Sequence, residues 1–513
     1  MSEPQTPEYF ELGQFEIDTR TVRLLDEQYC RQNYIVLLGR ASSKPGAKLH
    51  LGVLDPARCM QHVQHVSQRL NIEVVPVQLN AYEITKAIDI GYAIVRAKAR
   101  GDLKLRLRPT QNVTFDPESS ADMIITEMLS QAITQGASDV HIEAYEDDVD
   151  VRYRIDGVLH QQTTPLAYDK LPAVVSRLKI LSDLDIAERR RSQEGRIYAT
   201  FQTEHGQRSV DIRLSICPAA FGEDVVMRIL DSNKPLIGLG QLGFFSDVLD
   251  DYTQLVNNPE GLILVTGPTG SGKTTTLYSS INTVRSDAKK IMTVEDPVET
   301  FLPKTNQKQV SVTMGFADYI RAFLRQDPDV IMVGEIRDND TTEIALRAAQ
   351  TGHLVLSTIH ANDAVGVVGR MSMLGAPGRV IADTLLGSLS QRLVRRICSH
   401  CKSEVEPDEF TKKVFERIGV EFPVYKGTGC SRCRHSGYVG RLGLFELFVN
   451  RPESADWIAA EEPVYRIRQR ARSLGMITLF EDAVRKVRAG VTDFAEVQRV
   501  MSYRSIREFL DDE

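Results

Sequence analysis

One loop, with the strand and helix that flank it, constrains the fold more than any other feature. An apolar run at residues 262–265 enters a glycine-rich loop, 267–274, with the pattern G-x-x-x-x-G-K-[ST], and a helical pattern follows. Glycines let backbone N–H groups converge on phosphate oxygens, while Lys273 adds a positive charge and Thr274 a hydroxyl for Mg²⁺. The alternative is a glycine-rich turn that binds no ligand. Such a turn would not require a strand before it and a helix after it, so the flanking pattern favours phosphate binding. The residues expected to bind phosphate are Gly267, Pro268, Thr269, Gly270, Ser271, Gly272, Lys273, Thr274 and Thr275.

Two further apolar runs in this region end in acidic residues. One run ends at Glu295 and Asp296, with Glu299 just beyond, and another ends at Glu335. In an open parallel sheet, ligands bind outside the carboxyl ends of the strands, which is where the P-loop also lies. Acids at that edge can order Mg²⁺-bound water or polarise the attacking water. A solvated acid at a strand end is the alternative, but two acid-ended strands beside a P-loop favour catalysis.

A histidine stands at each end of another predicted strand, residues 354–359. His360 follows the strand and therefore falls at the P-loop edge, so we predict that it senses the γ-phosphate or orients water. His353 precedes the strand and falls at the opposite edge. The two are seven positions apart, so on a regular strand their side chains point to opposite faces. From the residues alone, His353 is better explained as a structural cap.

Cysteines form a second recognisable motif. Two C-x-x-C pairs, with 28 residues between them, account for four of the seven cysteines: Cys398, Cys401, Cys430 and Cys433. Four thiolates in this pattern suit a tetrahedral, structural Zn²⁺. Redox-active pairs are the alternative, but no thioredoxin-like βαβ pattern surrounds either pair. His400 and His435 are close enough in sequence to replace a cysteine, so a mixed ligand set stays open.

Arginines form the last candidate group. Arg213 and Arg228 lie on strands predicted to precede the P-loop region, and Arg321 and Arg325 are one helical turn apart on a shared face. Arginines so placed can stabilise transition-state charge in phosphoryl transfer. The most basic run, residues 185–196, is typical of a solvated surface.

The chain of 513 residues is too long for one core, and its patterns change along its length. Residues 1–98 predict a small α/β module, and the polar, charged stretch 99–120 predicts a linker. Residues 121–235 combine a helical pattern with alternating strands and predict a second α/β domain. Residues 236–513 show strand–loop–helix units, typical of a parallel sheet covered by helices, with the cysteines in an insertion at 397–440 and a helical tail.

Composition narrows the class of protein. Hydrophobic residues make up 42% and charged residues 26%, as in ordinary globular proteins. The net charge of -7 disfavours nucleic-acid binding. No run of eighteen apolar residues predicts a membrane span, and no signal peptide is expected. Because no membrane span is expected, any membrane association is expected to be peripheral. An odd number of cysteines in a large chain without a signal peptide indicates a reducing compartment.

Taken together, these motifs resemble the assembly ATPases of type II secretion systems and type IV pili. The resemblance runs from about Ala121 through the cysteine insertion. It rests on "GASDVHIE", "VRYRIDG", "GPTGSGKTTT", "TVEDPVE", "LRQDPDVIMVGEIRD", "TGHLVLSTIHAND", the cysteine pairs and "GYVGRLGLFEL". It implies an α/β protein with a RecA-like P-loop ATPase domain that carries a zinc-binding insertion. A small PAS-like α/β domain and an N-terminal docking module would precede that domain.

The resemblance also implies roles for single residues. Lys273 and Thr274 match the P-loop lysine and the magnesium-contacting hydroxyl, and Glu335 matches the catalytic glutamate. His353 and His360 match a histidine box, which overrides the capping prediction for His353. The acidic box is matched by Glu295, Asp296 and Glu299, and arginines near the nucleotide by Arg213, Arg228, Arg321, Arg325, Arg337 and Arg370.

In this family, the implied cofactors are ATP, Mg²⁺ and structural Zn²⁺, and the implied assembly is a homohexamer. The ring would lie at the cytoplasmic face of the inner membrane, where the N-terminal module docks on the cytoplasmic domain of a membrane component. ATP hydrolysis would drive pseudopilus assembly and protein export by a type II secretion system, or extension of a type IV pilus. The chain's length and compact N-terminal module favour the first. Two other functions remain as alternatives. The negative net charge disfavours a nucleic-acid translocase. The complete set of acidic residues, with Glu335 among them, disfavours a nucleotide-gated scaffold that does not hydrolyse ATP.

Overall fold

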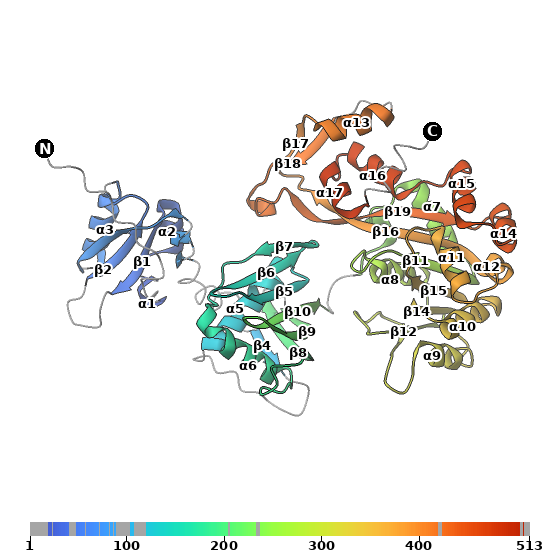
Figure 1. Cartoon of the computed structure of the whole chain (residues 1–513), viewed down its shortest axis with the longest axis horizontal. Coiled ribbons are helices and arrows are strands. Elements are labelled where there is room, and N and C mark those ends of the chain that lie inside the picture. Colours follow the sequence, from blue (N-terminus) through green and yellow to red (C-terminus); the bar gives the residue numbers. More distant parts are fainter. Residues whose placement is uncertain are drawn as a thin grey trace. The chain divides into compact units, whose positions relative to one another are not determined.

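The computed structural model describes most of the chain as separate folded parts (Figure 1). The described residues are 19–22, 24–40, 48–56, 58–70, 72–81, 83–85, 87–88, 103–106, 120–203, 206–231, 236–418, 423–502 and 506. They divide into two compact units, Met1–Asn233 and Lys234–Glu513. Among these residues, no helix combines the length and the apolar character needed to cross a bilayer.

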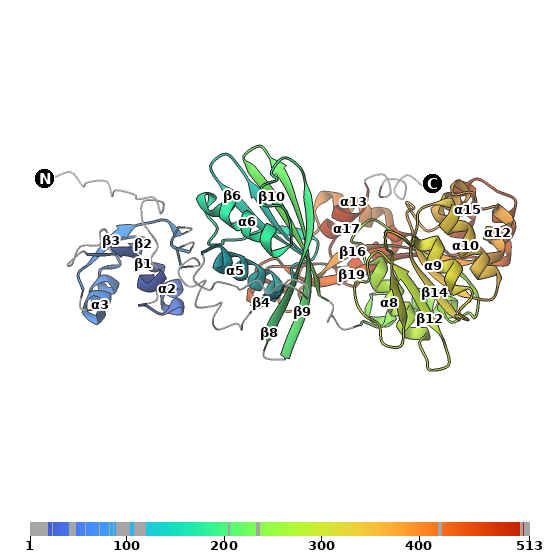
Figure 2. The ribbon, with the colours of Figure 1, turned by 90° about the horizontal axis from the view of Figure 1, so that it is seen from below.

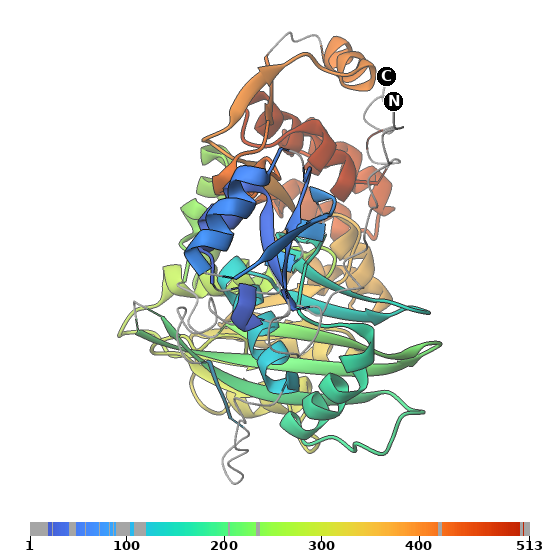
Figure 3. The same ribbon diagram turned by 90° about the vertical axis from the view of Figure 1, so that its left-hand side faces the viewer.

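The N-terminal module, drawn in blue in Figures 1 and 3, is a small α/β fold as the sequence predicts. Its sheet has the order β1-β2-β3, with β1 antiparallel and β3 parallel to the central strand β2. Buried aliphatic residues on all three strands pack against the helices. The elements are α1 (Thr19–Val22), α2 (Glu27–Asn33), β1 (Ile35–Arg40), β2 (Leu49–Val53), α3 (Met60–Leu70) and β3 (Val74–Gln78).

A seven-stranded antiparallel sheet forms the rest of the first unit, in the order β4-β8-β9-β10-β5-β6-β7. Helices α5 (Ser120–Gln135) and α6 (Leu171–Leu181) cover one face, as Figure 2 shows. Alternate residues such as Val225 and Met227 face these helices. The strands are β4 (Leu103–Arg106), β5 (Asp139–Ala144), β6 (Val149–Ile155), β7 (Val158–Gln161), β8 (Gln193–Thr203), β9 (Gly206–Ala219) and β10 (Gly222–Asp231).

The predicted linker at 99–120 is wrong for part of its length. Residues Leu103–Arg106 form edge strand β4, which pairs with β8, and Ser120 begins α5. Leucines and charged residues alternate over these four positions, but the run is too short to stand out as a strand from the polar stretch around it. The other residues of the stretch lie outside the described part of the chain.

The second unit is built on the predicted parallel sheet, in the order β13-β12-β14-β15-β11-β16-β19. Only the last pair, β16 with β19, is antiparallel. Strands β11, β12 and β15 are buried along their whole length, which explains their continuous apolar runs. The strands are β11 (Gly261–Thr266), β12 (Ile291–Glu295), β13 (Asn306–Gln309), β14 (Val330–Ile336), β15 (Leu354–Ile359), β16 (Leu385–Ile397) and β19 (Tyr438–Val449).

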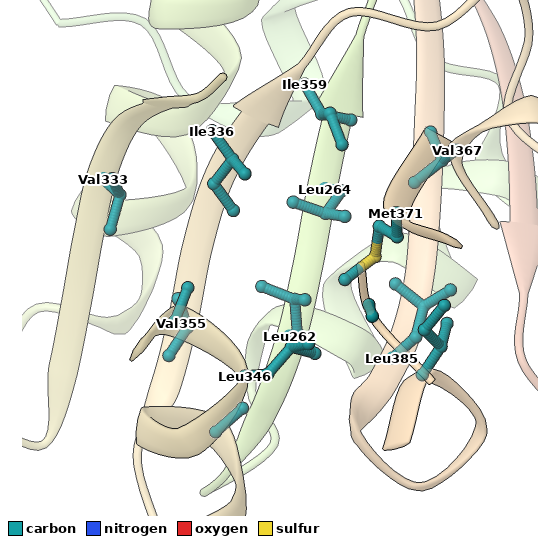
Figure 4. Close-up of a cluster of buried hydrophobic side chains, with 14 of the residues drawn as sticks. Leu262, Leu264, Val333, Ile336, Leu346, Val355, Ile359, Val367, Met371 and Leu385 are labelled. Carbon is teal, nitrogen blue, oxygen red and sulfur yellow. The ribbon is translucent and has the colours of Figure 1, made fainter. Parts of the chain in front are cut away.

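Helices cover both faces of this sheet because successive strand residues point to opposite sides. Leu262 and Leu264 pack in one cluster with residues of α9–α12, and Figure 4 shows Leu346 of α10 and Met371 of α11 near them. Ile263 and Val265 pack with α7 and α8 on the other face. The helices are α7 (Ser246–Val256), α8 (Lys273–Val284), α9 (Phe316–Phe323), α10 (Asn339–Gln350), α11 (Gly366–Met373) and α12 (Gly378–Thr384).

Strands β16 and β19 carry the cysteine insertion between them. The insertion contains β17 (Lys402–Val405), α13 (Glu409–Ile418) and β18 (Val424–Gly427), and β17 pairs with β18. The tail then forms α14 (Pro452–Ala459), α15 (Val464–Ser473), α16 (Leu479–Arg488) and α17 (Phe494–Val500). Helices α16 and α17 pack on the two long strands through an apolar cluster.

A buried ion-pair network fastens α17 to β16. The carboxylate of Glu496 accepts hydrogen bonds from the Nη2 of Arg395 at 2.6 Å and from the Nη2 of Arg499 at 2.7 Å. Burial alone raises the pKa of Glu496, but the N–H donors of Arg499 and Arg395 lower it to about 2. Because the folded-state pKa is depressed, this carboxylate stabilises the fold above its unfolded value of 4.5 and loses that effect as pH falls towards 2.

We therefore predict that Glu496→Gln lowers the free energy of unfolding at neutral pH by about 3 kcal/mol. Thermal unfolding measured from pH 7 to pH 3 should show the variant losing less stability on acidification than the parent. Glu416→Gln, an exposed position on α13, is the matched control and should behave like the parent. Equal acid sensitivity of parent and Glu496→Gln would contradict the prediction.

Candidate functional site

The P-loop adopts a backbone that only glycine tolerates well at three positions. Gly267, Gly270 and Gly272 have φ angles of 146°, 78° and 89°. A Cβ on Gly267 would lie 2.5 Å from the carbonyl oxygen of Gln391. Gly272 is the N-cap of α8 and offers no side chain to its N–H groups. The first turn of α8 therefore keeps N–H donors available for an anion.

Lys273 begins α8 and folds back over the loop. Its Nζ donates to the carbonyl oxygens of Gly267 at 2.8 Å and Pro268 at 3.2 Å. Burial lowers the pKa of Lys273, the carboxylate of Glu335 raises it, and the guanidinium of Arg392 lowers it. A partly desolvated ammonium group in this place suits contact with phosphate oxygens.

Two polar side chains from neighbouring segments hold the loop in place. The Nε2 of Gln391 donates to the Ser271 carbonyl at 2.6 Å, and its Oε1 accepts from the hydroxyl of Thr276 at 2.8 Å. The hydroxyl of Thr266 donates to the Ala361 carbonyl at 3.0 Å and accepts from the Ala361 N–H at 2.9 Å. Gln391 belongs to none of the recognised motifs, and the signal for it in the sequence is a glutamine within the strand of residues 385–397.

Glu335 stands where the strand pattern predicts, at the carboxyl end of β14. Its Oε1 lies 2.5 Å from the Nη2 of Arg337, and its Oε2 lies 3.7 Å from the Nε2 of His360. The hydroxyl of Thr358 donates to the Gly334 carbonyl at 2.8 Å and fixes the backbone just before the glutamate. The structure thus brings the glutamate, His360 and Arg337 together beside Lys273.

The acidic box divides into an inward and an outward part. Glu295 is 3% exposed and accepts hydrogen bonds from the Tyr278 hydroxyl at 2.5 Å, from Thr293 at 2.6 Å and from Gln307 at 3.0 Å. This carboxylate therefore ties α8 to β12, and its predicted catalytic role stays a prediction. Burial, followed by the charge of Glu295, raises the pKa of Tyr278.

The outward part is Asp296, which is half-exposed and lies 3.7 Å from the Nη2 of Arg337. Glu299 is exposed, and its backbone N–H donates to the hydroxyl of Tyr278 at 3.3 Å. Of the predicted acidic box, Asp296 is the residue linked to Glu335, because both carboxylates contact Arg337.

His353 lies at the other end of β15. Its Nδ1 is 2.9 Å from the Ala348 carbonyl and 3.2 Å from the Thr351 hydroxyl, at the end of α10. Six strand residues separate it from His360, which corresponds to roughly 20 Å. These contacts are those of a cap, and within one chain they keep His353 away from the P-loop.

Among the predicted arginines, Arg213 and Arg228 are cross-strand neighbours on β9 and β10, on the face opposite α5 and α6. The Nε of Arg228 donates to Asp139 at 2.9 Å. These arginines belong to the first unit and the P-loop belongs to the second, so their contact with a nucleotide stays a prediction.

In the second unit, Arg321 pairs with Asp318 at 3.2 Å. Helix α9 ends at Phe323, so the predicted helical face shared by Arg321 and Arg325 is wrong. The positive φ of Asp327, just before a proline, takes the chain out of the helical direction. Arg370 lies on α11, and its Nε is buried without a hydrogen-bond partner among the described residues.

The four cysteines converge as the spacing predicts. Their sulfur atoms lie within 4.8 Å of one another, and three Sγ–Sγ distances are 3.7, 3.8 and 3.9 Å. A tetrahedral Zn²⁺ with Zn–S bonds of about 2.3 Å requires sulfurs roughly 3.8 Å apart. Neither His400 nor His435 belongs to the cluster, so the geometry fits an all-thiolate zinc site.

Backbone donors prepare one of these thiols for metal binding. The Sγ of Cys433 accepts N–H bonds from Cys430 at 3.1 Å and Gly437 at 3.3 Å. Burial alone raises the pKa of Cys433, but these N–H donors and the thiols of Cys430 and Cys401 together lower it to about 6. The thiolate, which is the form that zinc binds, is therefore favoured at neutral pH.

Comparison with known proteins gives matches over most of the chain. The family model described as "Type II/IV secretion system protein" matches residues 116–499. Over 398 residues, 76% of this chain and 78% of the relative, the chain is 43% identical to the type II secretion system ATPase E of Vibrio cholerae. It is 36% identical over 509 residues to the type IV pilus assembly ATPase PilB of Pseudomonas aeruginosa, covering 96% of this chain and 88% of that one.

Among solved structures, the ATPase DotB of Legionella pneumophila matches 80% of this chain and 99% of its own, with a TM-score of 0.54. The sequence identity is 21%, so this likeness shows the fold alone.

We predict that the purified chain contains one equivalent of zinc and that Cys430→Ser releases it. Loss of one thiolate opens the tetrahedral site, so the cysteine insertion should lose stability. Metal analysis by mass spectrometry and thermal unfolding with and without a chelator check this. Cys217→Ser, at an exposed cysteine outside the cluster, is the matched control. A metal-free chain that is indifferent to the chelator would contradict the prediction.

Proposed function

This chain belongs to the type II/IV secretion system protein family, and we propose that it is the ATPase motor that drives pseudopilus assembly and protein export in a type II secretion system. The observation that carries the proposal is that Glu335 ends β14 and Lys273 follows β11 at the same edge of the sheet, near enough for the carboxylate to raise the pKa of Lys273. The family supports ATP hydrolysis, and this pair supplies a phosphate-binding cation and a base for the attacking water.

The chain's own residues divide the work of hydrolysis. The loop N–H groups and Lys273 hold the terminal phosphates of the substrate ATP. Thr274, in the first turn of α8, would hold Mg²⁺, which supplies neutralising charge at those phosphates. Glu335 accepts the proton of the attacking water, and His360, on the adjacent strand end, lies close enough to orient that water.

Arg337 is placed to exchange its carboxylate partners for a phosphate when ATP binds. It now contacts both Glu335 and Asp296, and its side chain is about half exposed. Because Glu335 must release this contact to accept a proton, a nucleotide phosphate near Arg337 would compete for the guanidinium. Such an exchange would couple the arrival of ATP to the freeing of the base.

Type IV pilus assembly is the second candidate, and the extent of the matches favours it. Sequence identity does not separate the two candidates, because the secretion ATPase and a type IV pilus assembly ATPase of Acinetobacter baylyi both match at 43%, over 76% and 74% of this chain. The match to the pilus assembly ATPase of Pseudomonas aeruginosa covers 96% and therefore includes most of the N-terminal module. Both candidates are motors of secretion or pilus systems that hydrolyse ATP.

The proposed assembly is a homohexamer at the cytoplasmic face of the inner membrane. Arg213 and Arg228 of the sheet β4–β10 would close over nucleotide bound to the P-loop, in the same chain or a neighbouring one. The N-terminal module would dock on the cytoplasmic domain of an inner-membrane component, which would make the association peripheral. The net charge of -7 supports a motor that does not act on nucleic acid.

We predict that Glu335→Gln binds ATP but hydrolyses it at least 100-fold more slowly, because the variant lacks the base. Glu295→Gln should instead lower the melting temperature, since it weakens the contacts that tie α8 to β12. The two variants make the same chemical change at the ends of neighbouring strands, so each controls for the other. Phosphate release and thermal unfolding are the measurements.

The opposite pattern would contradict these assignments. If Glu295→Gln abolished hydrolysis without any change in melting temperature, then the buried carboxylate would act in the nucleotide site. If Glu335→Gln kept the parental rate, then another group would be the base.

In the organism of origin, we expect a chromosomal Lys273→Ala substitution to abolish export of secreted proteins while surface pili persist. The variant lacks the P-loop charge but keeps the fold, and immunoblotting confirms that it is produced. Loss of pili with normal export would instead support the pilus alternative. Normal export and normal pili together would contradict both motor assignments.

A further inference from the structure

Arg392 lies beside the P-loop although no recognised motif contains it. Strand β16 runs parallel to the P-loop strand β11, with Ser390 paired to Thr266, the last residue of β11. The next two residues of β16, Gln391 and Arg392, therefore extend past the end of β11 and flank the loop. Gln391 supports the loop through the hydrogen bonds described above, and Arg392 is the next residue along.

The guanidinium of Arg392 lies between two loops of the nucleotide site. Its Nη1 donates to the Gln391 carbonyl at 3.0 Å, and its Nη2 lies 3.5 Å from the Asn362 carbonyl, two residues after His360. An ideal Cβ on Gly267 would be 3.3 Å from the same Nη1. The group thus stands at the first glycine of the P-loop, on the side of the histidine-bearing loop.

This cation has no ion-pair partner among the described carboxylates. Burial lowers the pKa of Arg392, and the more distant charges of Glu446 and Asp363 raise it. Both carboxylates are already engaged. Asp363 pairs with Arg468 at 2.5 Å, and Glu446 accepts the N–H groups of Ala364 at 2.8 Å and Leu479 at 3.1 Å.

Lys273 is a second positive charge at the same loop, which makes a bound anion more favourable there. The charge of Arg392 lowers the pKa of Lys273, which shows that the two groups repel each other across the loop. Guanidinium has five N–H donors in a planar fork that matches phosphate, and Arg392 directs only two contacts, both to carbonyl oxygens. Bringing two like charges to one loop costs free energy unless an anion lies between them.

We propose that Arg392 binds the terminal phosphates of ATP held by the P-loop, as a nucleotide-binding residue supplied by β16. This inference deepens the proposed function and rests on the P-loop binding ATP. The competing explanation is that Arg392 is only a long-range counter-ion of Glu446 that stabilises the fold.

The test is Arg392→Gln, with ATP and AMP competing against a fluorescent nucleotide. A lost charged hydrogen bond should weaken ATP binding about tenfold or more. AMP lacks the terminal phosphates, so its affinity should stay unchanged and the preference for ATP over AMP should shrink. Arg392→Lys keeps the charge and should recover part of the ATP affinity. The melting temperature of the nucleotide-free variant should match that of the parent.

Arg396→Gln is the matched control, because this exposed arginine lies on the same strand and should leave both affinities unchanged. Equal losses for ATP and AMP together with a lower melting temperature would overturn the proposal in favour of the counter-ion role. An unchanged ATP affinity would overturn it as well. If the parent bound no ATP, the proposed function would fail too, whereas a binding parent with an unaffected variant removes this inference alone.

Discussion

The close approach of Gly267 to β16 is the contact on which the nucleotide site depends. No side chain fits between this glycine and the Gln391 carbonyl, so the P-loop can leave β11 directly beside β16 only because residue 267 is a glycine. The side chain of Gln391 then bonds both the loop and α8, while Thr266 bonds the segment after β15. Sheet order therefore decides which strand ends surround the phosphates, and it selects β15 and β16.

The same strand also connects the nucleotide site to the cysteine cluster. Cys398 follows Gln391 by seven residues, and nearly all of these residues belong to β16, so the two sites lie roughly 20 Å apart along one strand. Pairing with β19 and the Arg395–Glu496 contact with α17 stiffen this strand. A zinc site at its end would hold β16 and β19 together where the insertion leaves and rejoins the sheet. By stabilising β16, the zinc site would also help to hold Gln391 in the position from which it bonds the P-loop.

Local patterns predicted the P-loop, the end positions of Glu335 and His360, and the cysteine cluster, because each depends on neighbouring residues or on one strand. What they could not predict depends on packing between distant segments. Glu295 shares a face with Thr293, and only the position of Tyr278 on α8 shows that this face is closed. Arg392 became a site residue through the pairing of β16 with β11, which no motif records. Strand β4 was missed because its pairing partner, β8, lies about a hundred residues away.

The two histidines show why nearness in sequence can mislead in a parallel sheet. His353 and His360 belong to one motif, yet the strand between them crosses the whole sheet and places them at opposite edges. A residue at the amino edge cannot meet phosphates at the carboxyl edge of the same sheet. A nucleotide role for His353 therefore requires either the site of another chain at that edge, as a ring would allow, or a relay through β15. Without either, its bonds to Ala348 and Thr351 account for its position as the cap of α10.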